Sequence, residues 1–165
     1  MIRPERPADH AAIASVTAAA FLDAPHSGHN EQFIVAALRD AGVLHLSFVA
    51  EVDAAVAGHI AVSPVSIAGG SVGWFGIGPV SVIPALQGRS MGSKLVHQAL
   101  DALRDQGASG CVVLGDPLYY ARFGFKNEPG LLLPGVPPEY LMVVSFGPAV
   151  PVGIVTYHHA FMATH

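Results

Sequence analysis

The spacing of apolar residues changes along this chain, and its first part has the period of helices. After a short predicted strand over residues 2–6, apolar positions recur every three or four residues in two segments, which predicts two helices. These positions are Ile13, Val16, Ala20 and Phe21 in the first segment, and Phe33, Ile34, Ala37 and Leu38 in the second. Asp9 and Asn30 are typical N-cap residues, so we expect them to begin these helices, and Gly42 to end the second.

From Leu44 the pattern becomes that of β-strands. Residues 44–52 and 56–67 are rich in apolar and β-branched side chains. They flank a turn at residues 53–55, which predicts an antiparallel pair. A second turn at Gly69-Gly70 leads into the next strand.

This next strand, residues 71–83, is long and rich in glycine. Glycine weakens a strand unless the backbone bends or another group approaches closely. Gly76, Gly78 and Pro79 therefore predict a bulge, at which the strand splays away from a neighbour.

The helix that follows has the clearest amphipathic pattern in the chain. It is expected to begin at about Ser90 and to end at Gly107. Its apolar stripe consists of Met91, Leu95, Val96, Ala99, Leu100 and Leu103. Residues 110–115 then form a short apolar strand.

A short helix and two strands complete the predicted elements. Asp116 is a typical N-cap and Pro117 suits the first helical position, so this helix begins there and ends at Gly124. Residues 140–146 and 153–161 have the pattern of strands.

These elements predict one domain over residues 1–165, of the α/β (α+β) class. We expect a central, mixed and mostly antiparallel sheet of about seven strands, splayed at the fourth strand and flanked by about four helices. A chain of 165 residues is long enough to bury a substantial core.

The composition is apolar, with 52% hydrophobic and only 12% charged residues. Neither residues 54–88 nor those after Glu139 include Asp, Glu, Lys or Arg. Prolines and glycines interrupt both stretches, so we expect strands buried on both faces rather than membrane spans. The start of the sequence has no apolar signal region, which favours a soluble, cytoplasmic protein without a membrane partner.

Charge and cysteine content exclude several classes of function. The net charge is −4 and there is no basic run, which argues against a nucleic-acid partner. The single cysteine, Cys111, excludes a disulfide framework and a cysteine metal site. His158 and His159 are adjacent on a predicted strand and would face opposite sides, and His26 and His29 lack a suitably spaced third ligand. We therefore expect no metal.

Residues 80–92 carry the candidate chemistry. They read V-S-V-I-P-A-L-Q-G-R-S-M-G, a β-branched run, a turn and the start of a helix. The first turn of a helix exposes free N–H groups at the positive end of its dipole, where phosphate binds. The stretch lacks both the G-K-[ST] ending of a P-loop and the spaced glycines of a dinucleotide fingerprint. It is therefore either a metal-free phosphate cradle of main-chain amides or a tight turn that binds nothing.

This stretch resembles the acetyl-CoA motif of the GNAT-type N-acetyltransferases, a strand ending in V-x-P followed by [QR]-x-x-G-x-[GA]. Residues 112–125, V-V-L-G-D-P-L-Y-Y-A-R-F-G-F, are similar to a small bacterial branch of predicted acetyltransferases in that family. The predicted order of elements also resembles the family's fold, so the resemblance spans nearly the whole chain. One departure is Ser90, where the family usually has glycine.

The resemblance implies that acetyl-CoA is the co-substrate. Its pyrophosphate would be held by main-chain amides of Gln87, Gly88, Arg89, Ser90, Met91, Gly92 and Ser93. Its pantetheine arm would pair with main-chain groups of Val80, Ser81 and Val82, because it is an extended chain that carries amides. An amide of the same strand can also donate to the thioester oxygen. Arg89 and Arg122 either assist the phosphates or are surface charges.

The resemblance also implies a catalytic role for Tyr120. In the family, a tyrosine four residues before a Gly-Phe pair serves the departing thiolate, and this pair is Gly124-Phe125 here. A tyrosine has a pKa of about 10, so it is protonated at neutral pH and can donate. The alternative is that Tyr120 only packs the short helix, which is the role that we expect for Tyr119.

The sequence does not identify a general base. The motif strand has no carboxylate between Gly69 and Gln87, where some family members place one. His26, His29 and Glu31 are candidates for the substrate side, because they lie at the predicted corner between the first two helices. The alternatives are that these histidines are only solvated, that Glu31 stabilises a helix N-terminus, and that water relays the proton.

The resemblance thus implies an acetyl-CoA-dependent N-acetyltransferase, in which a primary amine attacks the thioester directly in a ternary complex. Cys111 lies in an apolar run, where burial raises a thiol pKa, so it is a poor nucleophile. Ser90 and the missing base favour the alternative, a non-catalytic acyl-CoA-binding or sensing module. The expected partner is a small-molecule or peptide amine, and the acidic net charge slightly favours a cationic one. The uncharged C-terminal strands offer an edge for a homodimer.

Overall fold

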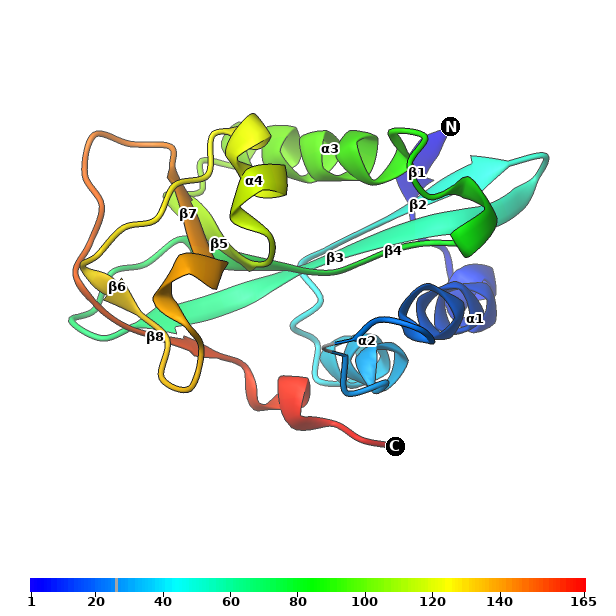
Figure 1. Cartoon of the computed structure of the whole chain (residues 1–165), viewed down its shortest axis with the longest axis horizontal. Coiled ribbons are helices and arrows are strands. Elements are labelled where there is room, and N and C mark those ends of the chain that lie inside the picture. Colours follow the sequence, from blue (N-terminus) through cyan, green and yellow to red (C-terminus); the bar gives the residue numbers. More distant parts are fainter. Residues whose placement is uncertain (26) are drawn as a thin grey trace.

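The computed structural model describes residues 1–25 and 27–165, and its centre is one sheet with helices on both faces (Figure 1). The strands are β1 (Ile2–Pro4), β2 (Leu46–Val52), β3 (Ala55–Ile67), β4 (Trp74–Val82), β5 (Gly110–Leu114), β6 (Leu131–Leu132), β7 (Leu141–Ser145) and β8 (Gly153–Tyr157). The α-helices are α1 (His10–Phe21), α2 (Glu31–Asp40), α3 (Met91–Asp105) and α4 (Pro117–Tyr120). Figure 1 shows α3 on one face of the sheet, and α1 and α2 on the other.

The strand order agrees with the predicted mixed, mostly antiparallel sheet. The central order is β1-β2-β3-β4-β5-β7, with β8 beside the far end of β3 and β6 beside β8. Only the β4–β5 and β6–β8 pairs are parallel. The eighth strand, absent from the prediction, is β6, whose two residues are too few to show a period.

The predicted bulge in the fourth strand is confirmed. Ile60 of β3 pairs with Val80, whereas Val62 pairs with Ile77, so β4 carries one extra residue between these pairs. On its other side, β4 pairs with β5 only as far as Ile77. Beyond this point the two parallel strands separate, and the last part of β4 keeps β3 as its neighbour.

The predicted stripe of α3 packs against the sheet. Its buried residues are Leu95, Val96, Ala99, Leu100 and Leu103, while Met91 is partly exposed. They meet the β3 side chains of Ile60 and Val62, together with Phe125 after α4. This core fixes the start of α3 beside the end of β4.

Asp9 and Asn30 stand at the predicted N-cap positions of α1 and α2, but within the described chain neither side chain makes a capping hydrogen bond there, whereas the predicted cap of α4 does. Among the described residues, the Asn30 side chain caps nothing and instead donates to the Ala163 carbonyl at 2.8 Å. The Asp116 carboxylate accepts from the Leu118 amide at 2.9 Å, as a cap should. Asn30 therefore binds a segment near the C-terminus, a contact that the sequence alone does not show.

The Asp9 carboxylate binds the residues just before it rather than capping α1. A 3₁₀ turn over Pro7–Asp9 leads into the helix, and the Asp9 carboxylate accepts from the Arg6 amide at 2.7 Å. The Arg3 guanidinium donates to the same carboxylate at 2.8 and 3.0 Å, and also binds Glu51. Hydrogen bonding from Arg3 lowers the Asp9 pKa to about 2. The carboxylate thus joins β1 and β2 to the start of α1.

We expect Asp9→Asn to lower the free energy of unfolding near neutral pH by about 1 kcal/mol, because an amide cannot accept both hydrogen bonds of the Arg3 guanidinium. A carboxyl whose folded pKa is depressed stabilises above its unfolded pKa, and this contribution disappears as the pH falls through about 4 towards 2. Urea unfolding of both proteins across this range tests it. Asp101→Asn is the control, because Asp101 is 72% exposed in its pair with Arg104. An unchanged difference at low pH would contradict the assignment.

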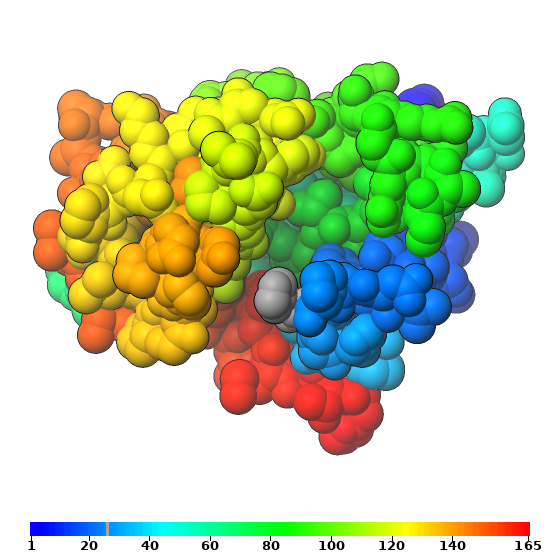
Figure 2. All heavy atoms as spheres, viewed as in Figure 1, coloured from blue at the N-terminus to red at the C-terminus, as the bar shows by residue number. Residues whose placement is uncertain are grey.

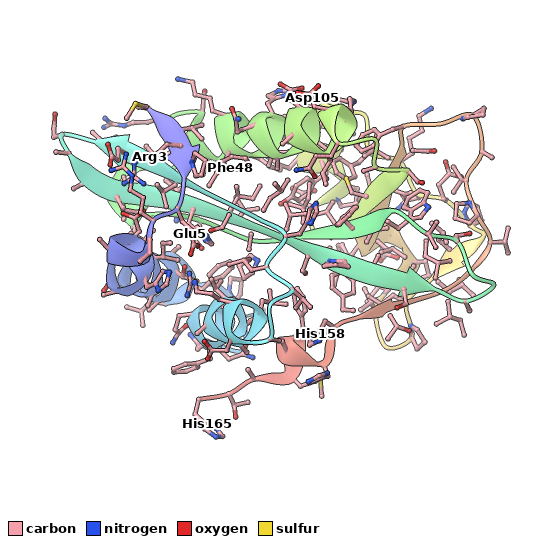
Figure 3. The ribbon with its side chains drawn as sticks, turned by 180° about the vertical axis from the view of Figure 1, so that it is seen from behind. Arg3, Glu5, Phe48, Asp105, His158 and His165 are labelled. Carbon is pink, nitrogen blue, oxygen red and sulfur yellow. The ribbon has the colours of Figure 1, made fainter. Side chains whose placement is uncertain are left out.

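A polar cluster around Glu5, which is labelled in Figure 3, connects α2 to the sheet. Arg39 of α2 donates to the Glu5 carboxylate at 2.9 and 3.0 Å, and the Ser47 hydroxyl donates to it as well. The Ser47 oxygen lies 2.7 Å from Nε2 of His59, which is fully buried. Burial lowers the His59 pKa to about 4, so this histidine is neutral at physiological pH.

The last predicted strand is too long. It ends at Tyr157, and residues His159–Met162 form a 3₁₀ turn. His158 accepts from the Ala160 amide through Nδ1 at 3.0 Å, and its ring centroid lies 4.2 Å from that of His159. The two rings are therefore side by side, and the expectation that they face opposite sides of a strand is wrong.

Candidate active site

An open cavity of about 470 Å³ lies between the β4–α3 junction and α4. In Figure 2 the front face is hollowed between the bright green segment leading into α3 and the yellow-green α4. The lining residues are Val80, Val82, Leu86, Gln87, Gly88, Ser90, Gly92, Ser93, Tyr119, Tyr120 and Arg122. Two segments far apart in the sequence, 80–93 and 119–122, thus meet at one site.

Most of the predicted binding residues line this cavity. Three of the predicted set do not: Ser81, Arg89 and Met91. The Ser81 side chain is buried in the sheet, and Arg89 is exposed on the turn. Met91 packs over β3, where its Sδ would lie 3.0 Å from a Cβ at Gly58. For these positions only main-chain groups remain as candidate contacts.

The end of β4 presents a free strand edge to the cavity. The Ile83 amide donates to the Ala57 carbonyl of β3 at 2.9 Å. Main-chain N–H and C=O groups alternate in direction along a strand, so those of Ser81, two residues earlier, also point at β3. The N–H and C=O groups of Val80 and Val82 therefore point to the other side of β4, where β5 no longer pairs with it. This edge can pair with an extended ligand that carries amides.

A tight turn joins this edge to α3. Gln87 donates from Nε2 to the Val82 carbonyl at 3.0 Å, which holds the turn against the strand. Gly88 follows with φ of +78°, and Gly92 and Ser93 of the first helical turn line the cavity. Free amides of a helical first turn, at the positive end of the dipole, suit an anionic group such as a phosphate.

The backbone conformation at Ser90 explains why the family motif usually has glycine at this position. Ser90 has φ of +68° and ψ of +4°, in the left-handed region that favours glycine. Its side chain is exposed, and among the described residues it makes no capping hydrogen bond. The departure from the motif therefore strains the backbone but keeps the Ser90 amide in place.

We expect Ser90→Gly to raise the free energy of unfolding by about 0.5–1 kcal/mol, because glycine adopts this conformation without strain. Ser93→Gly is the matched control. Ser93 lies within α3, where glycine should instead destabilise by about 0.5–1 kcal/mol. Urea unfolding measures both, and a lower stability of Ser90→Gly would contradict the strain.

The opposite wall of the cavity is α4, which positions Tyr120. The helix begins at the Asp116 cap, and the Tyr120 ring packs against Gly115, where a Cβ would clash with it. The ring also makes an edge contact with Phe125, at 5.8 Å between centroids. Burial, assisted by Tyr119, raises the Tyr120 pKa to about 12, so its hydroxyl stays protonated. It is a hydrogen-bond donor in the cavity wall.

Tyr119 also lines the cavity, although we predicted only a packing role for it. Its hydroxyl lies 3.4 Å from the Ser93 hydroxyl, which connects α4 to the first turn of α3. The Arg122 guanidinium lies 4.6 Å from the centre of the Tyr119 ring. Arg122 is the only charged residue in the lining described, so the cavity favours an anion.

The predicted acceptor-side residues are not part of this lining. In the part of the chain that the structure describes, His29 and Glu31 do not line the cavity, and the Glu31 carboxylate accepts from the Ser27 hydroxyl at 2.7 and 2.8 Å. His26 lies outside the described residues. In Figure 2 the blue α1–α2 segment borders the hollow from below.

Three further features concern the single cysteine, metal binding and membrane spanning. Cys111 is buried in β5, and burial raises its thiol pKa, so it is not an activated nucleophile. Over residues 1–25 and 27–165, no cluster of three or more His, Cys, Asp or Glu side chains is arranged to hold a metal ion. No helix in the same ranges is both long and apolar enough to span a bilayer.

Comparison with known sequences gives a consistent family. Residues 11–125 match the model of the "Acetyltransferase (GNAT) family". The uncharacterized N-acetyltransferase YhbS of Escherichia coli K12 is 35% identical over 127 residues, which are 76% of this chain and 73% of YhbS. A shorter match, 38% over 50 residues, links the chain to YjhQ of the same organism.

Solved structures extend this similarity to the whole fold. A GNAT family acetyltransferase from Brucella melitensis, in complex with acetyl-CoA, is 51% identical with a TM-score of 0.88, over 98% of this chain and 97% of that one. YhbS from Escherichia coli, in complex with CoA, is 32% identical with a TM-score of 0.87, over 100% of this chain and 93% of that one. The arrangement of strands and helices described above is therefore shared with both.

Proposed function

Since the chain belongs to the acetyltransferase (GNAT) family, we propose that it transfers the acetyl group of acetyl-CoA to a primary amine. One observation carries the proposal: a single cavity combines a free strand edge, the N-terminal turn of α3 and the protonated hydroxyl of Tyr120. The complexes of the two similar proteins with acetyl-CoA and CoA support it.

The cavity suits the pyrophosphate and the pantetheine arm of acetyl-CoA. The amides of residues 87–93 bind the pyrophosphate at the positive end of the α3 dipole, and Arg122 adds positive charge. Val80 and Val82 pair with the amides of the pantetheine arm, which lies along β4 in place of a strand. When the pantetheine arm lies along β4, its thioester points towards the place where β4 and β5 separate.

The acetyl group passes to the amine in one step. The free amine attacks the thioester carbonyl, an amide of β4 donates to the developing oxyanion, and the C–S bond breaks to release the CoA thiolate, while the nitrogen gives up one proton to water. Tyr120 donates a hydrogen bond to that thiolate. Its pKa of about 12 exceeds the value of about 8.5 for an ordinary thiol, so it stabilises the charge without giving up its proton.

Initial-rate kinetics test the one-step mechanism. With acetyl-CoA and the amine varied together, a ternary complex gives intersecting double-reciprocal lines, and mass spectrometry finds no acetylated enzyme. Parallel lines, together with an acetyl adduct on the protein, would require a covalent intermediate and contradict direct attack.

A specific observation favours a second function, a non-catalytic acyl-CoA-binding module. Among the described lining residues there is no carboxylate and no imidazole, so the cavity itself offers no ordinary general base. Such a module would bind acetyl-CoA, with a clear thermal shift, and would acetylate none of a broad panel of amines.

A further inference from the structure

Two buried hydroxyls on the α1–α2 face of the sheet have no hydrogen-bond partner among the described residues. They are Oη of Tyr157, on β8, and Oγ of Ser63, on β3. Buried polar groups are nearly always paired, because an unpaired one loses its bonds to water without compensation. Phenylalanine and alanine would avoid this cost, so the fold alone gives no reason for either hydroxyl.

Both side chains lie around the same glycine. Ser63 pairs directly with Gly76 of β4, and Val65 pairs with Tyr157, so all four belong to one patch of the sheet. A Cβ at Gly76 would lie 2.7 Å from the Tyr157 ring and 3.1 Å from Val65. Because directly opposed residues point to the same face, Ser63 and the tyrosine ring share the face of Gly76.

This patch lies where β4 and β5 separate. Gly76 pairs with Val112 of β5, and Ile77 is the last residue of β4 that pairs with β5. The acetyl-CoA cavity begins three residues later, at Val80, on the side of α3 and α4. Burial raises the pKa of Tyr157, so its hydroxyl stays protonated and its oxygen can accept a hydrogen bond.

On the basis of the proposed acetyl transfer, we propose that Tyr157 and Ser63 form the acceptor subsite and bind the nitrogen of the amine. The acceptor reaches the thioester from the α1–α2 face of the splay, and acetyl-CoA lies on the other face. The amine N–H groups donate to the two hydroxyl oxygens, and the nitrogen lone pair stays free to attack.

The subsite selects a neutral amine. The residues that pair with or meet Gly76 are Ser63, Val65, Val112 and Tyr157, and none carries a charge. An ammonium placed there would lose its hydration without gaining a counter-charge, so burial favours the free base. The ligand class is therefore a primary amine that is weakly basic, such as an aryl hydrazine. Such an amine reacts without a strong general base in the protein.

The other unpartnered buried atoms lie farther along the same two strands. Nδ1 of His59 and Oγ of Ser81 also lack described partners, and these residues oppose each other across β3 and β4. Nε2 of His59 is bound through Ser47 to the Glu5–Arg39 ion pair. His59 and Ser81 lie four and five positions along β3 and β4 from Ser63 and Gly76, so they are not part of the subsite.

Tyr157→Phe and Ser63→Ala test the subsite, with phenylhydrazine as the neutral probe and benzylamine as the protonated one. We expect kcat/KM for phenylhydrazine to fall about tenfold or more in each variant, because each loses a bond to the acceptor. The Kd for acetyl-CoA should stay within about twofold, and the urea midpoint should be unchanged or higher. The wild type should prefer phenylhydrazine to benzylamine near pH 7.

Thr156→Val and Ser66→Ala are the matched controls. Both hydroxyls belong to exposed residues of the same strands, which pair with each other on the opposite face. They should behave as wild type. Equal kcat/KM in the site variants and these controls would overturn the subsite and leave the acetyl transfer intact, as would a preference for benzylamine. A wild type that binds acetyl-CoA and acetylates no amine would overturn both the subsite and the proposed function.

Discussion

Replacing Gly92 by leucine is expected to weaken acetyl-CoA binding about 100-fold, or about 2.7 kcal/mol. Gly92 lies in the first turn of α3, where a Cβ would lie 3.3 Å from the Tyr119 hydroxyl and 3.9 Å from the Val82 side chain. A leucine extends beyond this Cβ into the space between β4 and α4. It therefore blocks the approach of the pyrophosphate to the helix amides. Isothermal titration with acetyl-CoA measures the loss.

Gly147→Leu is the control for this variant. A Cβ at Gly147 meets no atom within 4 Å, its φ is not in the left-handed region, and it lies outside the cavity. Its Kd for acetyl-CoA should equal that of the wild type. Urea unfolding of both variants separates a blocked cavity from a damaged fold. Wild-type affinity in a folded Gly92→Leu protein would contradict the phosphate cradle.

Replacing Tyr120 by phenylalanine is expected to lower kcat about 100-fold and to change the Kd for acetyl-CoA by less than about twofold. In the proposed mechanism, the hydroxyl interacts with charge that develops on sulfur only as the C–S bond breaks, so its removal weakens the transition state and not the bound complex. Phenylalanine keeps the contacts of the ring with Gly115 and Phe125. Steady-state turnover and titration with acetyl-CoA supply the two numbers.

Tyr140→Phe is the matched variant, because Tyr140 is 45% exposed and does not line the cavity. It should turn over as the wild type does. Since the Tyr120 pKa is raised to about 12, the wild-type rate should show no loss from ionisation of this hydroxyl at neutral or mildly alkaline pH. Unchanged turnover in Tyr120→Phe would remove this residue from the mechanism.

The features that could be predicted from the sequence depend on local signals. The period of α3, the Asp116-Pro117 start of α4 and the glycines that bulge β4 are each decided by residues close in the chain. The signal for a candidate phosphate site at the β4–α3 junction is local too. Its link to Tyr120, by contrast, came from the resemblance of two motifs to one family.

What could not be predicted depends on contacts between distant segments. Asn30 has the side chain of a helix cap, but it donates instead to the Ala163 carbonyl near the other end of the chain. Tyr119 enters the cavity only because α4 packs opposite the first turn of α3. No local pattern shows which distant partner a polar side chain will find.

The same limit applies to the proposed acceptor subsite. Ser63, Gly76 and Tyr157 belong to three strands, and only their register brings them together. The sequence shows that β4 has no carboxylate. The structure explains this at Gly76, where the Tyr157 ring occupies the space that a side chain would need. The nearby hydroxyls, rather than a charged base, are the polar groups at this position.

Ser90 has an explanation that the sequence could not supply. Its left-handed backbone shows why a glycine suits the motif, and its exposed side chain shows why serine is tolerated. The amide, which is the group that would bind phosphate, is the same for both residues. This departure therefore weighs less in favour of a non-catalytic module than the sequence alone indicates.

The most direct test of the account is a product analysis with purified protein, acetyl-CoA and a panel of primary amines that includes weakly basic ones. Mass spectrometry should find one acetyl group added to the amine nitrogen, with an equal amount of CoA released, and the yield should collapse in Gly92→Leu. Binding of acetyl-CoA with no acetylated amine anywhere in the panel would contradict the proposed enzyme and leave only a binding module.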